Sequence, residues 1–351
     1  MNIVHIVPTA GWAGSEKIAF SFAIHQAFNH KVAVVVKTGP GFSARFYRDK
    51  LPANVNLIVI NPSLKTQQEI NRFVKASLEF VPDIIHAHLS LGCRIAKSMK
   101  SPDNVIIGHM HIRFFALQFK EMDAVVAVSP WQLDDVPAWY QGKKRLVCNF
   151  ISNNWQKTVV DLFRFRKRFY IEKSDYIIGT VSRLHIEKGI DTLIKAFIKS
   201  DLKNAKLVIV GDGPDAEKLR VMASGQDNII FTGFLDDAAQ FMAAFDLYVS
   251  TSRADSFGLS VLEAISQDVP VLASATYGSK DIFGDSAQLF EIDDCRALAE
   301  KLKDARNQKL RNNVFIDAFD EKSSNAELIS FYKEILEEKF SIPTENCPLV
   351  A

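Results

Sequence analysis

The feature that most constrains the fold is a series of short runs, rich in valine and isoleucine, in which apolar residues are continuous rather than alternating. In the first half of the chain these runs cover residues 3–8, 32–36, 55–60, 83–86, 105–108, 124–128 and 146–148. Segments of helix length separate them, and residues 15–28 carry apolar side chains at helical spacing. Continuous apolar runs are typical of strands that are buried on both faces of a parallel sheet. The first half therefore predicts an α/β fold.

The same pattern starts again after residue 170. Further runs cover residues 176–182, 205–210, 229–232, 247–250, 269–273 and 287–290. Two successive series predict two doubly wound, Rossmann-like domains, 1–165 and 166–324, with a break near 155–172. A length of 351 residues agrees, because a single core rarely exceeds about 250–300 residues. We expect a C-terminal helix over about 325–351, frayed at its end, that packs back on the first domain.

The net charge of +1 conceals a strong asymmetry along the chain. Residues 1–170 contain 22 lysines and arginines against 11 acidic residues, a balance of +11, and the remainder has a balance of −10. The positive half is expected to face something anionic, such as phospholipid headgroups or a phosphorylated acceptor; alternatively, the two halves attract each other across a cleft. The basic run 164–168 is either a solvated helix face or part of such a contact. Nucleic acid is not expected, because the basic residues are not interleaved with aromatic residues along one stripe.

Targeting signals are not recognisable in the sequence. The N-terminus lacks a basic segment and runs directly into a strand pattern. No apolar stretch approaches the roughly 18–20 residues that span a bilayer. The four cysteines are scattered, which fits a reducing compartment. We expect a cytoplasmic protein that associates peripherally with the inner membrane surface.

Four of the eight histidines cluster at the predicted ends of two strands, as His86, His88, His109 and His111. Alternate residues of a strand point to one face, so each pair shares a side of the sheet. Such a cluster suggests a metal site, but no carboxylate or cysteine lies at a matching spacing, and we expect no metal. Two interpretations remain: a polar histidine that hydrogen-bonds a sugar hydroxyl or a phosphate, and a satisfied core.

Several loops that follow predicted strands combine glycines or cations. Arg183 and Lys188 lie five residues apart, and a guanidinium with an ammonium suits a diphosphate, although two solvated cations on a surface loop explain them equally well. The junctions around Gly213 and Phe234 bring backbone donors and acceptors to one sheet edge. The loop after the first run ends with Gly14 before a helix whose N-terminus favours an anion. It lacks the GxGxxG spacing of a nicotinamide site, and a plain turn is the alternative.

The most specific stretch is STSRADSFGLSVLEA, residues 250–264. Gly258 allows the chain to turn into a helix, whose free N–H groups could hold a phosphate. Glu263, a few residues into that helix, is placed to accept hydrogen bonds from two vicinal ribose hydroxyls. Asp255 supplies a second carboxylate.

This stretch resembles the motif S-x-x-x-E-x-F-G-x-x-x-x-E-A of the retaining glycosyltransferases of family GT4, which have the GT-B fold. The matching positions are Ser252 or its neighbours, Asp255, Phe257, Gly258, Glu263 and Ala264. Asp255 stands where the family usually has glutamate, a longer side chain. Residues 179–189, 211–214 and 231–234 look like the family segments G-R-L-x-x-x-K-G, G-x-G-P and F-x-G-x. The C-terminal half therefore matches more strongly than the N-terminal half.

The resemblance implies two Rossmann-like domains that face a central cleft, with the acceptor on the first and the donor on the second. It also implies retention of anomeric configuration without a metal or other cofactor. The catalytic residues that it implies are Asp255, His111, Arg183 and Lys188. The residues that it implies for the nucleotide-sugar donor are Glu263, Gly14, Gly213, Phe234, Ser256, Phe257, Gly258 and Leu259. His109 and His88 are further candidates, on the acceptor side.

The predicted activity is transfer of a hexose or N-acetylhexosamine from a nucleotide sugar, UDP-linked by default and GDP-linked as the alternative. The expected acceptor is a glycan or lipid-linked glycan in cell-surface polysaccharide or lipopolysaccharide synthesis. Within the same fold, a nucleotide-sugar 2-epimerase explains the nucleotide site but not the basic first half. An inverting transferase with a histidine base fits the two acidic residues less well. A scaffold protein that has lost activity is the alternative outside the enzymes.

Overall fold

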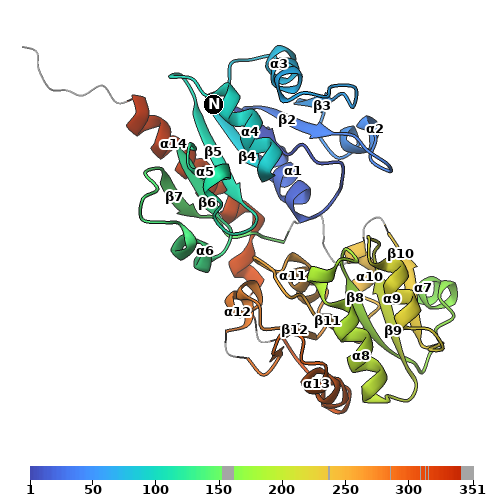
Figure 1. Cartoon of the computed structure of the whole chain (residues 1–351). Coiled ribbons are helices and arrows are strands. Elements are labelled where there is room, and N and C mark those ends of the chain that lie inside the picture. Colours follow the sequence, from blue (N-terminus) through green and yellow to red (C-terminus); the bar gives the residue numbers. More distant parts are fainter. Residues whose placement is uncertain are drawn as a thin grey trace, which may run out of the picture. The chain divides into compact units, whose positions relative to one another are not determined.

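The computed structural model describes residues 1–151, 162–235, 238–284, 286–308, 310–312, 314 and 316–340. The chain divides into two compact units, one formed by Met1–Cys148 with the segment from Lys322 onward, the other by Asn149–Glu321. Each unit contains one parallel sheet with helices beside it (Figure 1). The predicted α/β class with two Rossmann-like sheets is therefore confirmed.

The sheet of the first unit has the strand order β3-β2-β1-β4-β5-β6-β7, with every neighbouring pair parallel. Its strands are β1 (Asn2–Ile6), β2 (Lys31–Lys37), β3 (Val55–Ile60), β4 (Ile84–His88), β5 (Val105–Met110), β6 (Ala124–Ala127) and β7 (Lys143–Leu146). The strand order reverses between β1 and β4, and doubly wound sheets bind ligands at the carboxyl ends of the strands beside such a switch point.

The two faces of this first sheet differ in character. Its helices are α1 (Gly14–Gln26), α2 (Ala44–Arg48), α3 (Gln67–Ser77), α4 (Leu89–Met99), α5 (Ala116–Phe119), α6 (Pro130–Asp135) and α14 (Glu321–Phe340). On one face, Ile6 and Ile85 join an apolar core with Val74 of α3 and Ile95 of α4. On the other face the alternate residues include histidines, which meet side chains of α1 and α14. Among the described residues, no helix is both long and apolar enough to cross a bilayer.

The sheet of the second unit has the order β10-β9-β8-β11-β12-β13, again with parallel neighbours. Its strands are β8 (Tyr176–Val181), β9 (Ala205–Val210), β10 (Ile229–Gly233), β11 (Leu247–Ser250), β12 (Val271–Ser274) and β13 (Leu289–Phe290). The switch point lies between β8 and β11. The loops that follow these two strands are therefore the place to look for a ligand site.

The helices of the second unit cover an apolar core that includes Ile178 on β8 and Leu302 on α13 (Cys295–Asn307). They are α7 (Leu162–Arg168), η2 (Ile186–Lys188, a 3-10 turn), α8 (Ile190–Ser200), α9 (Ala216–Met222), α10 (Ala238–Met242), α11 (Leu259–Ser266), α12 (Tyr277–Phe283), α13 (Cys295–Asn307) and η3 (Ile316–Phe319). Asp294 caps α13, because its carboxylate accepts the N–H groups of Arg296 and Ala297, both at 2.9 Å.

Strand β7 differs from the sequence prediction, which placed a strand at 146–148. The strand is Lys143–Leu146, at the edge of the sheet, and its charged side chains reach α14. Lys143 Nζ lies 2.9 Å from Glu334, and Arg145 Nη1 lies 2.9 Å from Glu327. An edge strand whose side chains pair with a helix in this way carries no continuous apolar run, so the pattern could not reveal it.

The first unit ends at Cys148, before the boundary of 165 expected from the sequence. Helix α7 belongs to the second unit, because the ring of Phe165 packs on those of Phe241 at 5.6 Å and Phe245 at 6.3 Å. The basic run 164–168 is thus helical, with Arg166 donating to the carbonyl of Asp175 at 3.3 Å. Residues 152–161 and the tail 341–351 lie outside the described residues.

Candidate active site

The loops at the carboxyl edge of the second sheet approach one another closely because glycines stand at the contacts. A Cβ added to Gly213, after β9, would lie 2.3 Å from the carbonyl oxygen of Leu184, after β8. The N–H of Gly278, after β12, donates to the carbonyl of Asp255 at 3.2 Å, and a Cβ there would lie 2.5 Å from the nitrogen of Phe257. Only glycine permits such approaches. Residues that are far apart in the sequence therefore share one edge.

Arg183 and Lys188 lie on the loop after β8, and they differ in their surroundings. Arg183 is exposed, and among the described residues its guanidinium has no ion-pair partner. Lys188 Nζ lies 3.0 Å from Asp255 Oδ2, and the Lys188 side chain is 30% exposed. Gly189 ends this loop with φ of 60°, and a Cβ there would lie 2.1 Å from the carbonyl of Thr251. Within the described part of the chain, this loop therefore presents one cation without an ion-pair partner and one that is shared with a carboxylate.

Asp255 already has several hydrogen-bond donors within the second unit. Its Oδ2 accepts from Lys188 Nζ at 3.0 Å and from Ser252 Oγ at 3.4 Å. Its Oδ1 accepts from the N–H of Gly258 at 3.1 Å. The structure thus brings Lys188 and Asp255 together, two residues that the sequence placed on different motifs. A hydroxyl of a ligand would share this carboxylate with the lysine.

Helix α11 begins immediately after this turn, at Leu259. Gly258 adopts the left-handed backbone conformation, with φ of 93°, which favours glycine. Phe257 is 3% exposed, and its ring packs edge-to-face on Phe319 at 5.6 Å. The Phe257 side chain therefore belongs to the core, and only its backbone remains to face a ligand. The unsatisfied N–H groups of the first turn of such a helix favour an anion.

Glu263 and Phe234 complete the candidate residues of the second unit. Glu263 lies one turn into α11 and is buried, with 6% of its surface exposed. Phe234 follows β10, and its side chain is 55% exposed. The N–H of Gly211 donates to the carbonyl of Gly233 at 2.9 Å, which joins the loops after β9 and β10.

In the first unit, Gly14 is the first residue of α1, and the buried Glu16 lies two residues later. Glu16 Oε2 accepts from the N–H of Ala13 and from Ser15 Oγ, each at 3.0 Å. The hydroxyl of Thr9 donates to Glu16 Oε1. This helix end thus already holds a carboxylate. That counts against the phosphate which a free helix N-terminus would favour.

The candidate histidines form a connected cluster at the switch point of the first sheet. His88 is fully buried and His109 is 1% exposed, whereas His111, just after β5, is partly exposed. His88 Nδ1 and His111 Nε2 are hydrogen-bonded at 2.9 Å, and His109 Nδ1 and His86 Nε2 at 3.0 Å. The structure favours the core interpretation for His88 and His109, because side chains this deeply buried cannot present a nitrogen to an acceptor. Both nitrogens of His88 are hydrogen-bonded, whereas Nε2 of His109 has no hydrogen-bond partner among the described residues.

Two hydrogen-bonded chains run through this cluster, and each begins at a side chain of a covering helix. His5 Nε2 donates to Gln26 Oε1 of α1 at 2.8 Å, so the neutral ring of His5 accepts at Nδ1 from His88 Nε2, at 3.3 Å. In the other chain the hydroxyl of Tyr332, on α14, is hydrogen-bonded to His86 Nδ1. This chain ends at His109 Nε2, a buried nitrogen without a hydrogen-bond partner in the described part of the chain.

Burial keeps these histidines neutral. It lowers the pKa of His5 and that of His111 from 6.5 to about 4. It also lowers the pKa values of His86, His88 and His109 well below 6.5, and the neighbouring histidines act in the same direction. A charged imidazole in this cluster would lose its hydration and face other imidazoles.

The cluster is also the place to look for a metal site. Among the described residues, the one group of potential ligands consists of His5, His86 and His88, whose nitrogens lie within 4.8 Å of one another. However, the rings of His86 and His88 are stacked with an interplanar angle of 13°, and metal-binding lone pairs lie in the ring planes and must converge on the ion. These nitrogens already pair with one another or with Gln26 and Tyr332. We therefore interpret the cluster as a hydrogen-bonded core.

Sequence reasoning missed His5, Gln26 and Tyr332. The only signal for His5 was its position in the first apolar run, where a polar residue is out of place. His5 lies opposite His86 because of the parallel register of β1 and β4. Tyr332 reaches His86 because α14 packs against the first unit. Arg253, inside the most specific stretch, was given no role.

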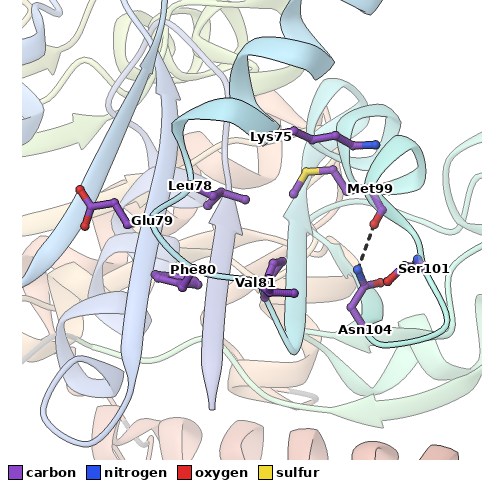
Figure 2. Close-up of a pocket in the computed structure, with 9 residues that line it drawn as sticks. Lys75, Leu78, Glu79, Phe80, Val81, Met99, Ser101 and Asn104 are labelled. Carbon is purple, nitrogen blue, oxygen red and sulfur yellow. Dashed lines mark hydrogen bonds between the residues drawn. The ribbon is translucent and has the colours of Figure 1, made fainter.

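A cavity of about 480 Å³ in the first unit lies away from these candidates. Figure 2 shows its lining, which comes from the end of α3 and from the segments that precede β4 and β5. Asn104 closes one side by donating to the carbonyl of Met99 at 2.9 Å. The cavity thus opens at the amino ends of the strands, opposite the edge at which doubly wound sheets bind ligands. None of the residues predicted from the sequence lines it.

Comparison with known proteins bears on the same residues. A family model described as glycosyl transferases group 1 matches residues 163–320, which include every candidate residue of the second unit. The N-acetyl-alpha-D-glucosaminyl L-malate synthase of Bacillus anthracis is 26% identical over 262 residues, 66% of this chain and 68% of that protein. The O-antigen biosynthesis glycosyltransferase WclY of Escherichia coli is 24% identical over 208 residues, 58% of each chain.

Among solved structures, the chain is similar to HepE of Anabaena, determined in complex with UDP and glucose. The TM-score is 0.72 at 18% identity, and the match covers 97% of this chain and 95% of that one. A likeness at this level of identity shows the fold.

Proposed function

We propose that the chain is a member of the glycosyl transferases group 1, whose family model matches residues 163–320, and a retaining, metal-independent transferase of a hexose or N-acetylhexosamine with the GT-B fold. The donor is a UDP-sugar. The acceptor is a glycan or lipid-linked glycan in cell-surface polysaccharide or lipopolysaccharide synthesis. The observation that carries the proposal is the meeting of Lys188 with Asp255 beside the first turn of α11.

We assign the donor diphosphate to the loop after β8 and to the start of α11. Arg183 is exposed and has no ion-pair partner among the described residues, and Lys188 lies five residues later on the same loop. These cations, with the backbone N–H groups of the first turn of α11, would stabilise the negative charge that develops on the departing nucleotide. A metal ion fills this role in other phosphate sites, and the proposed site does without one.

The remaining contacts of the donor follow from where its parts would lie. Glu263, buried one turn into α11, would accept hydrogen bonds from the ribose hydroxyls. Gly213 and Phe234 stand at the joined loops after β9 and β10, where the base would pack. Asp255, which already binds Lys188, would hold a hydroxyl of the sugar. UDP as the nucleotide is supported by HepE, whose structure contains UDP and glucose.

We assign the acceptor and a membrane surface to the first unit. WclY acts in O-antigen biosynthesis, which supports a cell-surface glycan as the product. Four large apolar side chains near the carboxyl end of β5 and beside α6 are between 45% and 88% exposed: Ile112, Phe115, Leu117 and Trp139. Together with the balance of +11 in residues 1–170, they fit the interface of an anionic bilayer. The protein would then work at the cytoplasmic face of a membrane.

The donor assignment is tested by titrating the purified protein with UDP, GDP and ADP in a calorimeter, with and without EDTA. We expect UDP to bind, unaffected by EDTA. Lys188→Ala and Arg183→Ala should each weaken binding roughly 10- to 100-fold, because a hydrogen bond to a charged group contributes about 1.5–3 kcal/mol. Arg296→Ala is the matched control, an exposed arginine of the same unit.

The other outcomes of this titration are informative. Binding of GDP instead of UDP would reassign the nucleotide, and binding that required a divalent metal would overturn metal independence. If no nucleotide binds, the scaffold alternative replaces the enzyme. Release of UDP from a UDP-sugar without any acceptor, accompanied by inversion at C2, would identify a 2-epimerase.

A further inference from the structure

A second arginine stands next to the proposed donor site without being free to bind a ligand. Arg253 lies in the loop after β11, two residues before Asp255, and its side chain is 24% exposed. Its Nη2 lies 2.9 Å from Asp191 Oδ1 and 2.8 Å from Asp293 Oδ1. Its Nε donates to Asp293 Oδ2 at 2.9 Å. Two carboxylates thus surround one guanidinium, so Arg253 offers little net positive charge to a diphosphate.

The two carboxylates come from different elements, each fixed by its own contacts. Asp191 lies in the first turn of α8 and also binds Lys195 at 3.2 Å. Asp293 precedes the N-cap of α13 in a left-handed conformation, with φ of 64°, and accepts from Thr192 Oγ1 at 2.8 Å. Burial, the largest single effect, would raise the pKa of Asp191, but the hydrogen bonds and charges of Arg253 and Lys195 together outweigh it, and the pKa is lowered. Arg253 therefore joins α8 to the segment before α13.

The same arginine also holds the loop that carries Lys188. Its Nη1 donates to the carbonyl of Ile186, and its backbone N–H donates to the carbonyl of Glu187 at 2.7 Å. The next carbonyl of the lysine loop, that of Lys188, accepts a hydrogen bond from Thr251 Oγ1 at 3.0 Å. Three consecutive carbonyls of the lysine loop, at residues 186–188, are thus bound from the loop after β11.

The planar guanidinium is suited to this arrangement. It offers five N–H donors in a fixed fork, so it can meet two carboxylates and a carbonyl at once. A lysine at this position would present a single ammonium on a flexible stem and could not reproduce these directions. The geometry therefore makes a specific demand for arginine at position 253.

We propose that Arg253 is a positioning residue that sets the place of Lys188 for the donor diphosphate, without touching the donor itself. This inference rests on the proposed function of Lys188. Arg253 anchors the loop to α8 and to the segment before α13 before any ligand arrives. The ammonium of Lys188 then stays within reach of Asp255, and the binding of the donor requires little further ordering of the loop.

The test compares Arg253→Gln, Arg253→Lys and the control Arg296→Gln, each in the full chain, at a temperature where all are folded by circular dichroism. The first readout is hydrogen–deuterium exchange of residues 184–189 without ligand. We expect exchange there to rise at least about tenfold in Arg253→Gln, with β9 and the later turns of α13 unchanged. The Arg296→Gln control should leave it unchanged. A uniform rise across the second unit, or no rise, would overturn the positioning role.

The second readout is the Kd for UDP in a double-mutant cycle with Lys188→Gln. Arg253→Gln should weaken UDP binding about tenfold in the wild-type background and not at all when Lys188 is already replaced, because it acts through that lysine. Arg253→Lys should recover only part of the loss. Equal losses in both backgrounds would refute the inference. If the wild-type protein binds neither UDP nor GDP, the proposed function fails, and the exchange measurement still decides whether Arg253 orders the loop.

Discussion

Mild acid is expected to unfold the first unit through its histidine cluster. Four histidines of the cluster, His5, His86, His88 and His109, are between 0% and 1% exposed. The groups that face them from the covering helices are Gln26 and Tyr332, and neither of these carries a charge that could compensate a protonated imidazole. Protonation of these imidazoles is therefore unfavourable as long as the first unit stays folded.

The sign follows from comparing the folded and unfolded states. In the unfolded chain a histidine takes up a proton near pH 6.5, whereas burial lowers the pKa of His5 and that of His111 to about 4 in the folded state. Between these values the unfolded state binds more protons, so the free energy of unfolding falls as the pH falls. Above pH 7 the contribution is constant.

The magnitude follows for the two residues whose pKa burial lowers to about 4. One pKa unit corresponds to about 1.4 kcal/mol, so a shift from 6.5 to about 4 costs each histidine roughly 3 kcal/mol by pH 4. His86, His88 and His109 add to this in the same direction. A typical domain has only about 5–15 kcal/mol of stability. The first unit should therefore unfold before pH 4.

The assay is urea denaturation at fixed pH values between 5 and 7.5, followed by tryptophan fluorescence. Trp12, Trp131 and Trp139 belong to the first unit, so their emission reports on it. Between pH 6.5 and 5 most carboxylates remain ionised, and each buried histidine contributes a slope of up to about 1.4 kcal/mol per pH unit. We expect a slope above about 2.5 kcal/mol per pH unit, and the variant His111→Gln should reduce it.

The variant His185→Gln, in the second unit, is the matched control and should leave the slope unchanged. A free energy of unfolding that stays flat from pH 6.5 to pH 5 would refute the reasoning, because it would mean that the cluster is protonated or hydrated when folded. A slope that His111→Gln does not alter would place the acid sensitivity elsewhere.

Further substitutions test the packing within each unit, and the effect of each on the free energy of unfolding is measured by urea denaturation. Gly213→Ala should destabilise the second unit by about 1–3 kcal/mol, because its Cβ would overlap the loop after β8, whereas Gly11→Ala, with no atom within 4 Å of the new Cβ, should be neutral. Phe257→Ala should cost about 3–5 kcal/mol and Phe257→Leu less than about 1.5 kcal/mol, since the ring is core; equal costs would contradict this. Tyr332→Phe should cost about 1–3 kcal/mol by leaving a buried imidazole nitrogen unsatisfied, and an unchanged stability would mean that this hydrogen bond contributes nothing. Lys143→Ala should cost less than about 1 kcal/mol, because its ion pairs are exposed, and a larger loss would show that they stabilise the edge strand.

Most of the fold was predictable because strands buried on both faces are continuous apolar runs. The strands at 55–60, 205–210 and 247–250 coincide with their predicted bounds. Strand β7 was misplaced, because Lys143 and Arg145 pair with a helix that lies almost two hundred residues later in the chain. Local patterns cannot report a contact of that kind.

The candidate site also contains residues that local sequence could place and residues that depend on contacts between distant parts of the chain. Gly258 at the start of α11 and the cations of one short loop follow from local chemistry, so the sequence could place them. The hydrogen bonds of His5 depend on strand register and on the packing of α1, which no local spacing encodes. Whether Arg253 binds a ligand or its neighbours also depends on where Asp191 and Asp293 meet it in space.

The first unit is assembled from two separate stretches of the chain, and this affects how it can fold during translation. Its sheet is complete once Cys148 has been made, but Tyr332, which covers His86, belongs to α14 and is synthesised only after the whole second unit. During translation the earlier part must wait, with its histidine face covered by α1 but not by α14, while the later unit has all its residues and can fold first. A stalled or truncated product ending near residue 320 would therefore expose that face and be a substrate for chaperones or proteases.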